Sequence, residues 1–145
     1  MSDNLFESIP VHKAYKQSSV WVAAFFGGPL ATGYLIAENF RSFGEQDKVK
    51  TAWLFTILAI LFVAIVVFIP GFEKVPGYFM PILYGVIANF FVMRYQAENI
   101  KKHNLNGGQF YSVGRVLLVS VIGFAITVGI LLLIGSFIDL TRLVR

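Results

Sequence analysis

Few side chains in this 145-residue sequence have the types and spacing that catalysis or metal binding requires. His12 and His103 are far apart and have no acidic neighbours at ligand spacing, so we expect no metal site. The chain has no Cys, which excludes a disulfide framework and a thiol nucleophile. Phosphate-binding glycine loops, serine nucleophile elbows and the His-Glu-x-x-His motif are also absent from the sequence. The sequence therefore predicts a protein that is not an enzyme and needs no cofactor.

Asn89 is the most strongly polar side chain inside an apolar run. The interpretation we favour is a hydrogen bond from Asn89 to a backbone group or hydroxyl of a neighbouring helix. The alternative is that Asn89 contacts a solute in a pathway. No Asp, Glu, Lys or His falls in the middle of an apolar run, which argues against a proton-coupled pump.

Two acidic residues occupy matching places at the ends of apolar runs. Glu38 can pair with Arg41, and Glu98 can pair with Lys101 or its other basic neighbours. We expect exposed pairs at solvated helix ends, each worth only tenths of a kcal/mol. The alternative is a cytoplasmic docking surface formed by these four residues.

The elements that position these residues are long apolar segments. Hydrophobic residues make up 57% of the chain, charged residues 14%, and the mean hydropathy is +0.71. Soluble domains carry about 25% charged residues. Apolar runs cover residues 20–37, 51–69, 78–93 and 116–138. About 20 apolar residues cross a bilayer, so we predict an all-α membrane protein with four transmembrane helices and no sizeable soluble domain.

The linkers suggest an internal repeat. Ala-Glu-Asn, followed by an apolar and a basic residue, occurs at 37–41 and again at 97–101. We therefore expect one transmembrane domain built from two tandem helical hairpins. Its predicted parts are a polar tail (1–19), hairpin one (20–69), a loop (70–77), hairpin two (78–138) and a second tail (139–145).

Small residues recur every four positions in the first apolar run and form one smooth helix face. In lipid, such faces let helix backbones approach closely. We expect this face to pack on the protein's own second or fourth helix, or alternatively on an oligomer partner. Its members are Ala23, Ala24, Gly27, Gly28, Ala31, Thr32 and Gly33.

A third interpretation treats Gly27-Gly28-Pro29 as a deliberate break in the helix. Pro29 lacks an N–H and clashes with the carbonyl of Phe25. Broken helices can line substrate sites, so Pro29 is a candidate pathway residue.

The segment Phe26-Gly27-Gly28-Pro29-Leu30-Ala31-Thr32-Gly33-Tyr34-Leu35, followed by Asn39-Phe40-Arg41-Ser42-Phe43-Gly44, is similar to a motif in small, functionally uncharacterised multi-pass membrane proteins of bacteria. The resemblance covers about 20 residues. It implies a bacterial inner-membrane location, and it implies no substrate, reaction or catalytic residue.

The distribution of Lys and Arg predicts orientation, because these residues accumulate in cytoplasmic loops. With four spans, one side carries Lys13, Lys16, Lys74, Arg142 and Arg145, and the other carries the remaining seven. This excess of two favours both Ala-Glu-Asn loops in the cytoplasm and both termini outside. If residues 20–37 instead re-enter the membrane without crossing it, Lys13 and Lys16 join the larger group and the ratio becomes nine to three. We expect four spans, and the stronger bias is the best argument for the re-entrant alternative.

These features predict an integral inner-membrane protein that acts by helix packing. We expect a non-enzymatic accessory or assembly subunit of a membrane complex, or a homo-oligomer. The expected partners are the lipid bilayer and other membrane subunits, not nucleic acid. The alternative is a small oligomeric transporter or channel for an uncharged or lipophilic solute.

Overall fold

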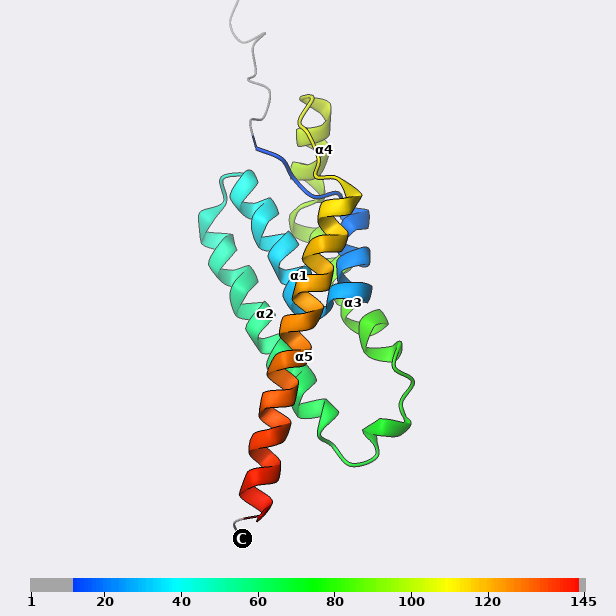
Figure 1. Ribbon diagram of the computed structural model, residues 1–145. Helices are drawn as coiled ribbons and strands as arrows, with labels where there is room; N and C mark the ends of the chain where they lie inside the picture. The colour runs from blue at the N-terminus through cyan, green and yellow to red at the C-terminus, as the bar shows by residue number, and fades with distance from the viewer. Residues whose placement is uncertain (1–11, 144–145) are drawn as a thin grey trace, which may run out of the picture.

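The computed structural model describes the backbone of residues 12–143 and the side chains of residues 12–139. Within this range the chain is helical, apart from loops and one isolated β-bridge between Ala14 and Phe110. The expected all-α class is confirmed. Parts of the two expected tails, residues 1–11 and 144–145, lie outside the described residues. The elements are α1 (Gln17–Ser42), α2 (Gln46–Val67), the short 3₁₀ turn η1 (Phe72–Lys74), α3 (Phe79–Tyr95), α4 (Ala97–Leu105) and α5 (Val113–Leu143) (Figure 1).

Helix α1 is not one straight helix. Its backbone breaks at Gly28, where φ is 70° and ψ is −165°. In a continuous helix, residues 15 and 39 would lie about 36 Å apart, because each residue adds 1.5 Å. Instead, the backbone N–H of Tyr15 donates to Asn39 Oδ1 at 2.6 Å, and Ser42 Oγ donates to the carbonyl of Lys13 at 2.7 Å. Helix α1 is therefore a helical hairpin, with a first arm (residues 17–27) and a second arm (residues 29–42) lying side by side (Figure 1).

The fold-back corrects the expectation that residues 20–37 form one transmembrane crossing. A positive φ is strained for residues with a Cβ, and Gly28 tolerates it. Pro29 follows with no N–H, so the first arm cannot continue through it. The arms are about 16 and 21 Å long by helical rise, well short of the roughly 30 Å hydrocarbon core. This geometry matches the re-entrant alternative.

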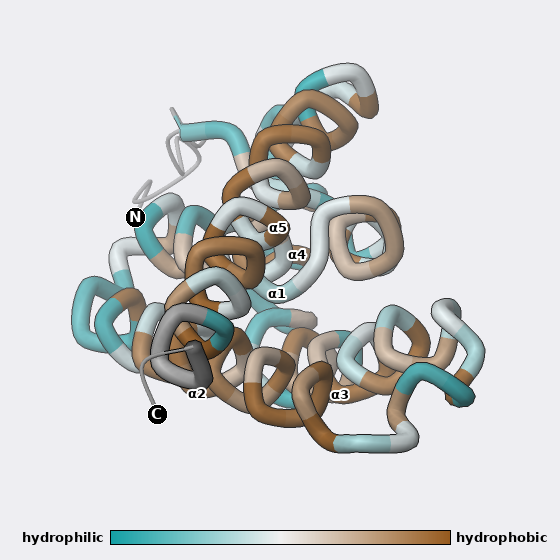
Figure 2. Tube along the Cα trace, turned by 60° about the horizontal axis from the view of Figure 1, so that its bottom comes forward, coloured by the Kyte–Doolittle hydropathy of each residue, from teal (hydrophilic) through white to brown (hydrophobic). Residues whose placement is uncertain are grey.

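The hairpin forms the interior of the protein, and the other long helices pack around it. In the most apolar window of each helix, 67% of α1 is buried, against 22% of α2 and 17% of α5. Helices α2, α3 and α5 all contact α1, whereas α2 and α5 contact each other little. Their outward faces are apolar, and polar residues gather in the connecting segments (Figure 2).

Three described helices are long and apolar enough to cross a membrane: α1, α2 and α5. Helix α3 is also apolar but has only 17 residues. These helices indicate a membrane protein. Four spans are not confirmed, because α1 returns to the end from which it started.

The two Ala-Glu-Asn triplets lie in different local structures. Residues 37–39 belong to the last turns of α1, and Asn39 is fully buried. Residues 97–99 begin the separate helix α4. The sequence repeat is therefore not matched by a repeat of local structure.

Candidate functional site

A buried polar cluster closes the open end of the α1 hairpin. Asn39 Nδ2 donates to the carbonyl of Tyr15 at 3.0 Å and lies 3.2 Å from Gln96 Oε1. Gln96, between α3 and α4, donates from Nε2 to the carbonyl of Ile36 at 2.8 Å. The side chains of Tyr15, Asn39 and Gln96 are all fully buried. The cluster therefore joins the chain before α1, the second arm of α1 and the end of α3.

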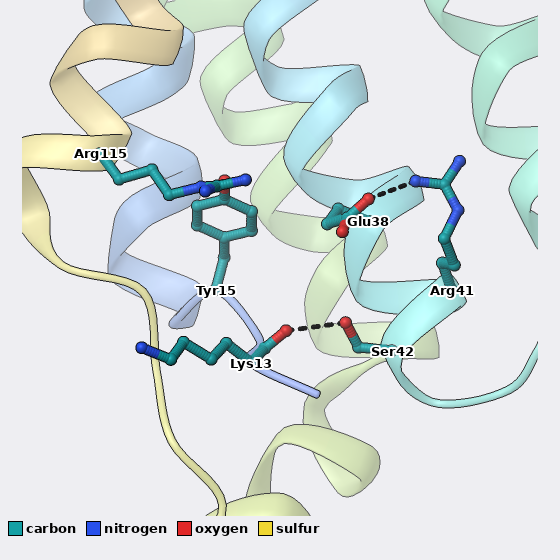
Figure 3. Close-up of polar contacts among 6 residues, drawn as sticks. All are labelled: Lys13, Tyr15, Glu38, Arg41, Ser42 and Arg115. Atoms are coloured by element: carbon teal, nitrogen blue, oxygen red, sulfur yellow. Dashed lines mark hydrogen bonds and ion pairs between the residues drawn. The ribbon is translucent and has the colours of Figure 1, made fainter. Parts of the chain in front are cut away.

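The start of α5 is attached to the same cluster through Tyr15 (Figure 3). Arg115 Nε donates to the Tyr15 hydroxyl at 3.1 Å, and its guanidinium lies 4.2 Å from the centre of the Tyr111 ring. Burial raises the pKa of Tyr15 above its ordinary value, and the hydrogen bond from Arg115 opposes part of this rise. Tyr15 therefore remains neutral and accepts a hydrogen bond from a permanent cation.

His103 packs between the α1–α2 connection and the α4–α5 loop, at the end of the protein where the α1 hairpin opens. Its Nε2 lies 2.9 Å from the carbonyl of Gln109, and its ring packs edge-on against Phe43 and Phe110. The chain at Ala14 pairs with the same loop, because its N–H donates to the Gln109 carbonyl at 3.1 Å. These contacts hold the α4–α5 loop against the chain that enters α1.

The structure places the small residues of α1 inside the protein. A Cβ at Gly27 would meet Ser120 Cα at 2.6 Å, and one at Gly33 would overlap the Thr56 side chain. Across the same contact, a Cβ at Gly123 would meet Ala31 Cβ at 2.8 Å. The remaining members are also buried: Ala23, Ala24, Gly28 and Thr32. This face therefore packs against α2, α3 and α5 of the same chain and is not available to another subunit.

An apolar groove of about 270 Å³ lies between the second arm of α1, α2 and α3. Thr32 and Thr56 are among its lining residues, and their hydroxyls donate to the carbonyls of Gly28 and Ala52, each at 2.8 Å. Its other lining residues are Pro29, Gly33, Ile36, Ala52, Phe55, Ala59, Tyr84, Ile87, Ala88 and Phe91. Because the lining is almost entirely apolar and both threonine hydroxyls already have backbone partners, the groove suits an apolar ligand.

The two candidate pathway residues are not brought together. Pro29 lines the groove, but Asn89 does not. Asn89 Oδ1 accepts a hydrogen bond from Gln17 Nε2 at 3.0 Å, and Asn89 Nδ2 lies 3.5 Å from Met93 Sδ. Asn89 therefore ties α3 to the start of α1, and its partner there is a side-chain amide instead of the expected backbone group or hydroxyl.

The loop residues form local pairs. Glu38 forms an ion pair with Arg41 (Figure 3), and Glu98 pairs with Lys102 at 3.0 Å instead of with Lys101. The α1–α2 and α4 segments do meet, because Asn99 Nδ2 donates to Glu45 Oε2 at 3.3 Å. The side chains that make this contact were not singled out from the sequence.

The burial of the polar cluster was not predicted from the sequence. Asn39 follows Glu38 at the end of an apolar run and resembles an ordinary polar helix end. Gln96 sits beside Arg94 in a segment that looks solvated. No local signal distinguishes their full burial, because their partners lie 24 and 57 residues away in the sequence.

Helix α5 carries a second small-residue face that the sequence analysis did not identify. Ser120, Gly123 and Thr127 are buried on the side of α5 that faces α1. Ala125 and Gly129 lie on the opposite side of α5, four residues apart, and Ser136 lies on the same side two turns after Gly129. A Cβ at Gly129 would meet no atom within 4 Å, and Ser136 is exposed. We call Ala125, Gly129 and Ser136 the outer stripe of α5.

Comparison with known proteins returns no match: no family model, curated protein or solved structure is detectably similar to this chain.

Proposed function

We propose that this protein is a non-enzymatic integral membrane protein of the bacterial inner membrane that acts by helix packing. It serves as an accessory or assembly subunit of a membrane complex, or as a homo-oligomer. The observation that supports this proposal is the outer stripe of α5, whose small residues face away from the rest of the chain.

The glycines that face the interior of the protein differ from Gly129 of the outer stripe in how closely a neighbouring element packs against them. Within this protein, Gly27, Gly33, Gly85 and Gly123 each lie against a neighbouring element so closely that a Cβ would clash. Gly129 has the same helical setting and no neighbour. Small residues in membrane helices let backbones approach and gain van der Waals contact, so a second helix can pack here.

The proposed membrane arrangement has a re-entrant α1 and three crossings, by α2, α3 and α5. Nine of the twelve Lys and Arg residues then belong to segments at the end where α1 opens, while Lys74 lies at the other end. Basic residues favour the cytoplasmic side, so this end faces the cytoplasm.

The test compares Gly129→Leu with Phe124→Trp, which adds bulk to a different exposed face of α5. The protein is purified gently at native expression level and analysed by native mass spectrometry. We expect wild type and Phe124→Trp to be recovered as a homo-oligomer or with a fixed partner, and Gly129→Leu as a monomer with an unchanged thermal midpoint. A wild-type protein that is monomeric and partnerless, or an assembly that tolerates Gly129→Leu, would contradict the proposal.

A further inference from the structure

The apolar groove leads along two helices toward basic residues. On α3 the lining residues Tyr84, Ile87, Ala88 and Phe91 follow one helical face. The next positions on that face are Arg94 and Tyr95.

The same register holds on α2. Ala52, Thr56 and Ala59 line the groove, and one turn earlier on that face lies Lys48. Both walls of the groove therefore end in a cation at the end of the molecule where α1 opens.

Aromatic rings connect the groove to these cations. Phe91 lies 6.1 Å from Phe55 and 6.1 Å from Phe40, between ring centres, so it joins α3 to α2 and to α1. Lys48 Nζ lies 5.7 Å from the centre of the Phe40 ring. On α3, Tyr95 lies 4.7 Å from Phe91, and the Arg94 guanidinium lies 6.0 Å from the Tyr95 ring.

The charge at this end is only partly balanced. Lys48 pairs with Glu45 at 2.6 Å. Arg94 is exposed, and no carboxylate among residues 12–139 lies within ion-pair distance of it. Lys50 adds a further exposed cation near the start of α2. The groove therefore has an apolar body and a cationic mouth.

We propose that this groove binds one anionic phospholipid, with an acyl chain against Ala59, Tyr84 and Ala88 and the phosphate held by Arg94 and Lys48. This inference uses the membrane placement proposed above but does not depend on α5 having a partner.

The length of the groove favours a lipid over a transmembrane helix. From Tyr84 to Arg94, α3 rises about 15 Å, which is half of a roughly 30 Å hydrocarbon core and therefore one leaflet. Pro29 lines the groove at the tip of the re-entrant hairpin. A partner helix, about 10 Å wide and crossing both leaflets, would not be accommodated by a pocket of about 270 Å³.

The headgroup is tested by native mass spectrometry of the purified protein titrated with phosphatidylglycerol or with phosphatidylcholine of identical acyl chains. We expect one phosphatidylglycerol per protomer, retained more strongly than phosphatidylcholine. Arg94→Gln should weaken phosphatidylglycerol binding by about fivefold, since one cation near a phosphate contributes about 1 kcal/mol. Lys101→Gln makes the same charge change on the exposed face of α4 and should leave binding unchanged.

The acyl-chain site is tested by Ala59→Trp, which fills the groove, against Leu58→Trp on the adjacent exposed face. Ala59→Trp should abolish retention of both lipids while Leu58→Trp preserves it, with similar thermal midpoints. Equal retention of the two lipids by wild type, lipid retention by Ala59→Trp, or a copurifying polypeptide that Ala59→Trp removes would overturn the inference. Gly129→Leu should still bind the lipid, so a failure of the assembly proposal is distinguishable from a failure of this one.

Discussion

At the scale of single residues, Asn39 connects parts of the chain that are far apart in the sequence. Its amide meets both backbone groups of Tyr15 and the side chain of Gln96. These partners belong to the chain before α1 and to the junction of α3 and α4. Because all of them are buried, each would lose its hydrogen bond without access to water if Asn39 were removed.

We therefore predict that Asn39→Leu strongly destabilises the protein, by about 1–3 kcal/mol for each buried group left unpaired. The measurement is the thermal unfolding midpoint in detergent. Asn104→Leu, at an exposed position on α4, serves as the control and should have little effect. A midpoint for Asn39→Leu that equals that of the control would show that the cluster does not stabilise the fold.

At the scale of elements, the hairpin of α1 depends on close packing against its neighbours. Gly33 approaches α2 so closely that a Cβ would lie 2.7 Å from Thr56 Cβ. Gly85 likewise leaves space on α3 for the Trp21 ring of the first arm. Each arm is too short to cross a bilayer, and these contacts pack the second arm against α2 and the first arm against α3.

We predict that Gly33→Ala lowers stability by about 1–3 kcal/mol through overpacking. Thr56→Ala removes Oγ1 and Cγ2, two of the three atoms that would clash, and keeps the Cβ at 2.7 Å, so the double variant should recover part of that loss. Thermal midpoints of the four proteins give the coupling energy. Strictly additive effects would show that the two residues are not in contact. Gly129→Ala, where a Cβ meets open space, is the matched control and should be neutral or stabilising.

At the scale of the whole molecule, the fold-back of α1 changes the topology. The chain before α1, the α1–α2 connection and α4 lie at one end, while η1 and the end of α5 lie at the other (Figure 1). With four crossings, His12 and Asn104 would face opposite sides of the membrane. With a re-entrant α1, they face the same side.

Single-cysteine variants test this directly, because the natural chain has no Cys. We predict that His12→Cys and Asn104→Cys are both protected from an impermeant thiol reagent in intact cells, while Lys74→Cys is labelled. The pattern should reverse in inverted membrane vesicles. Opposite accessibility of His12→Cys and Asn104→Cys would contradict the re-entrant topology.

Several elements follow from local composition. The apolar runs at 51–69 and 78–93 correspond to α2 and α3, because uninterrupted apolar residues favour helices whose backbone groups are satisfied internally. The pairing of Glu38 with Arg41 follows from their spacing on one helix face. The break at Gly27-Gly28-Pro29 is also visible in the sequence, as one of several interpretations.

The class of protein, the apolar helices and the place where the first of them is interrupted can be predicted from the sequence. These features depend on composition and on neighbours within one or two helical turns. The tertiary structure decided the direction of the chain after Gly28. That direction depends on contacts such as Tyr15 with Asn39 and Ile36 with Gln96, which join residues 24 and 60 positions apart. It also decided which small residues are used inside the protein and which face outward, since Gly33 and Gly129 differ only in what packs against them.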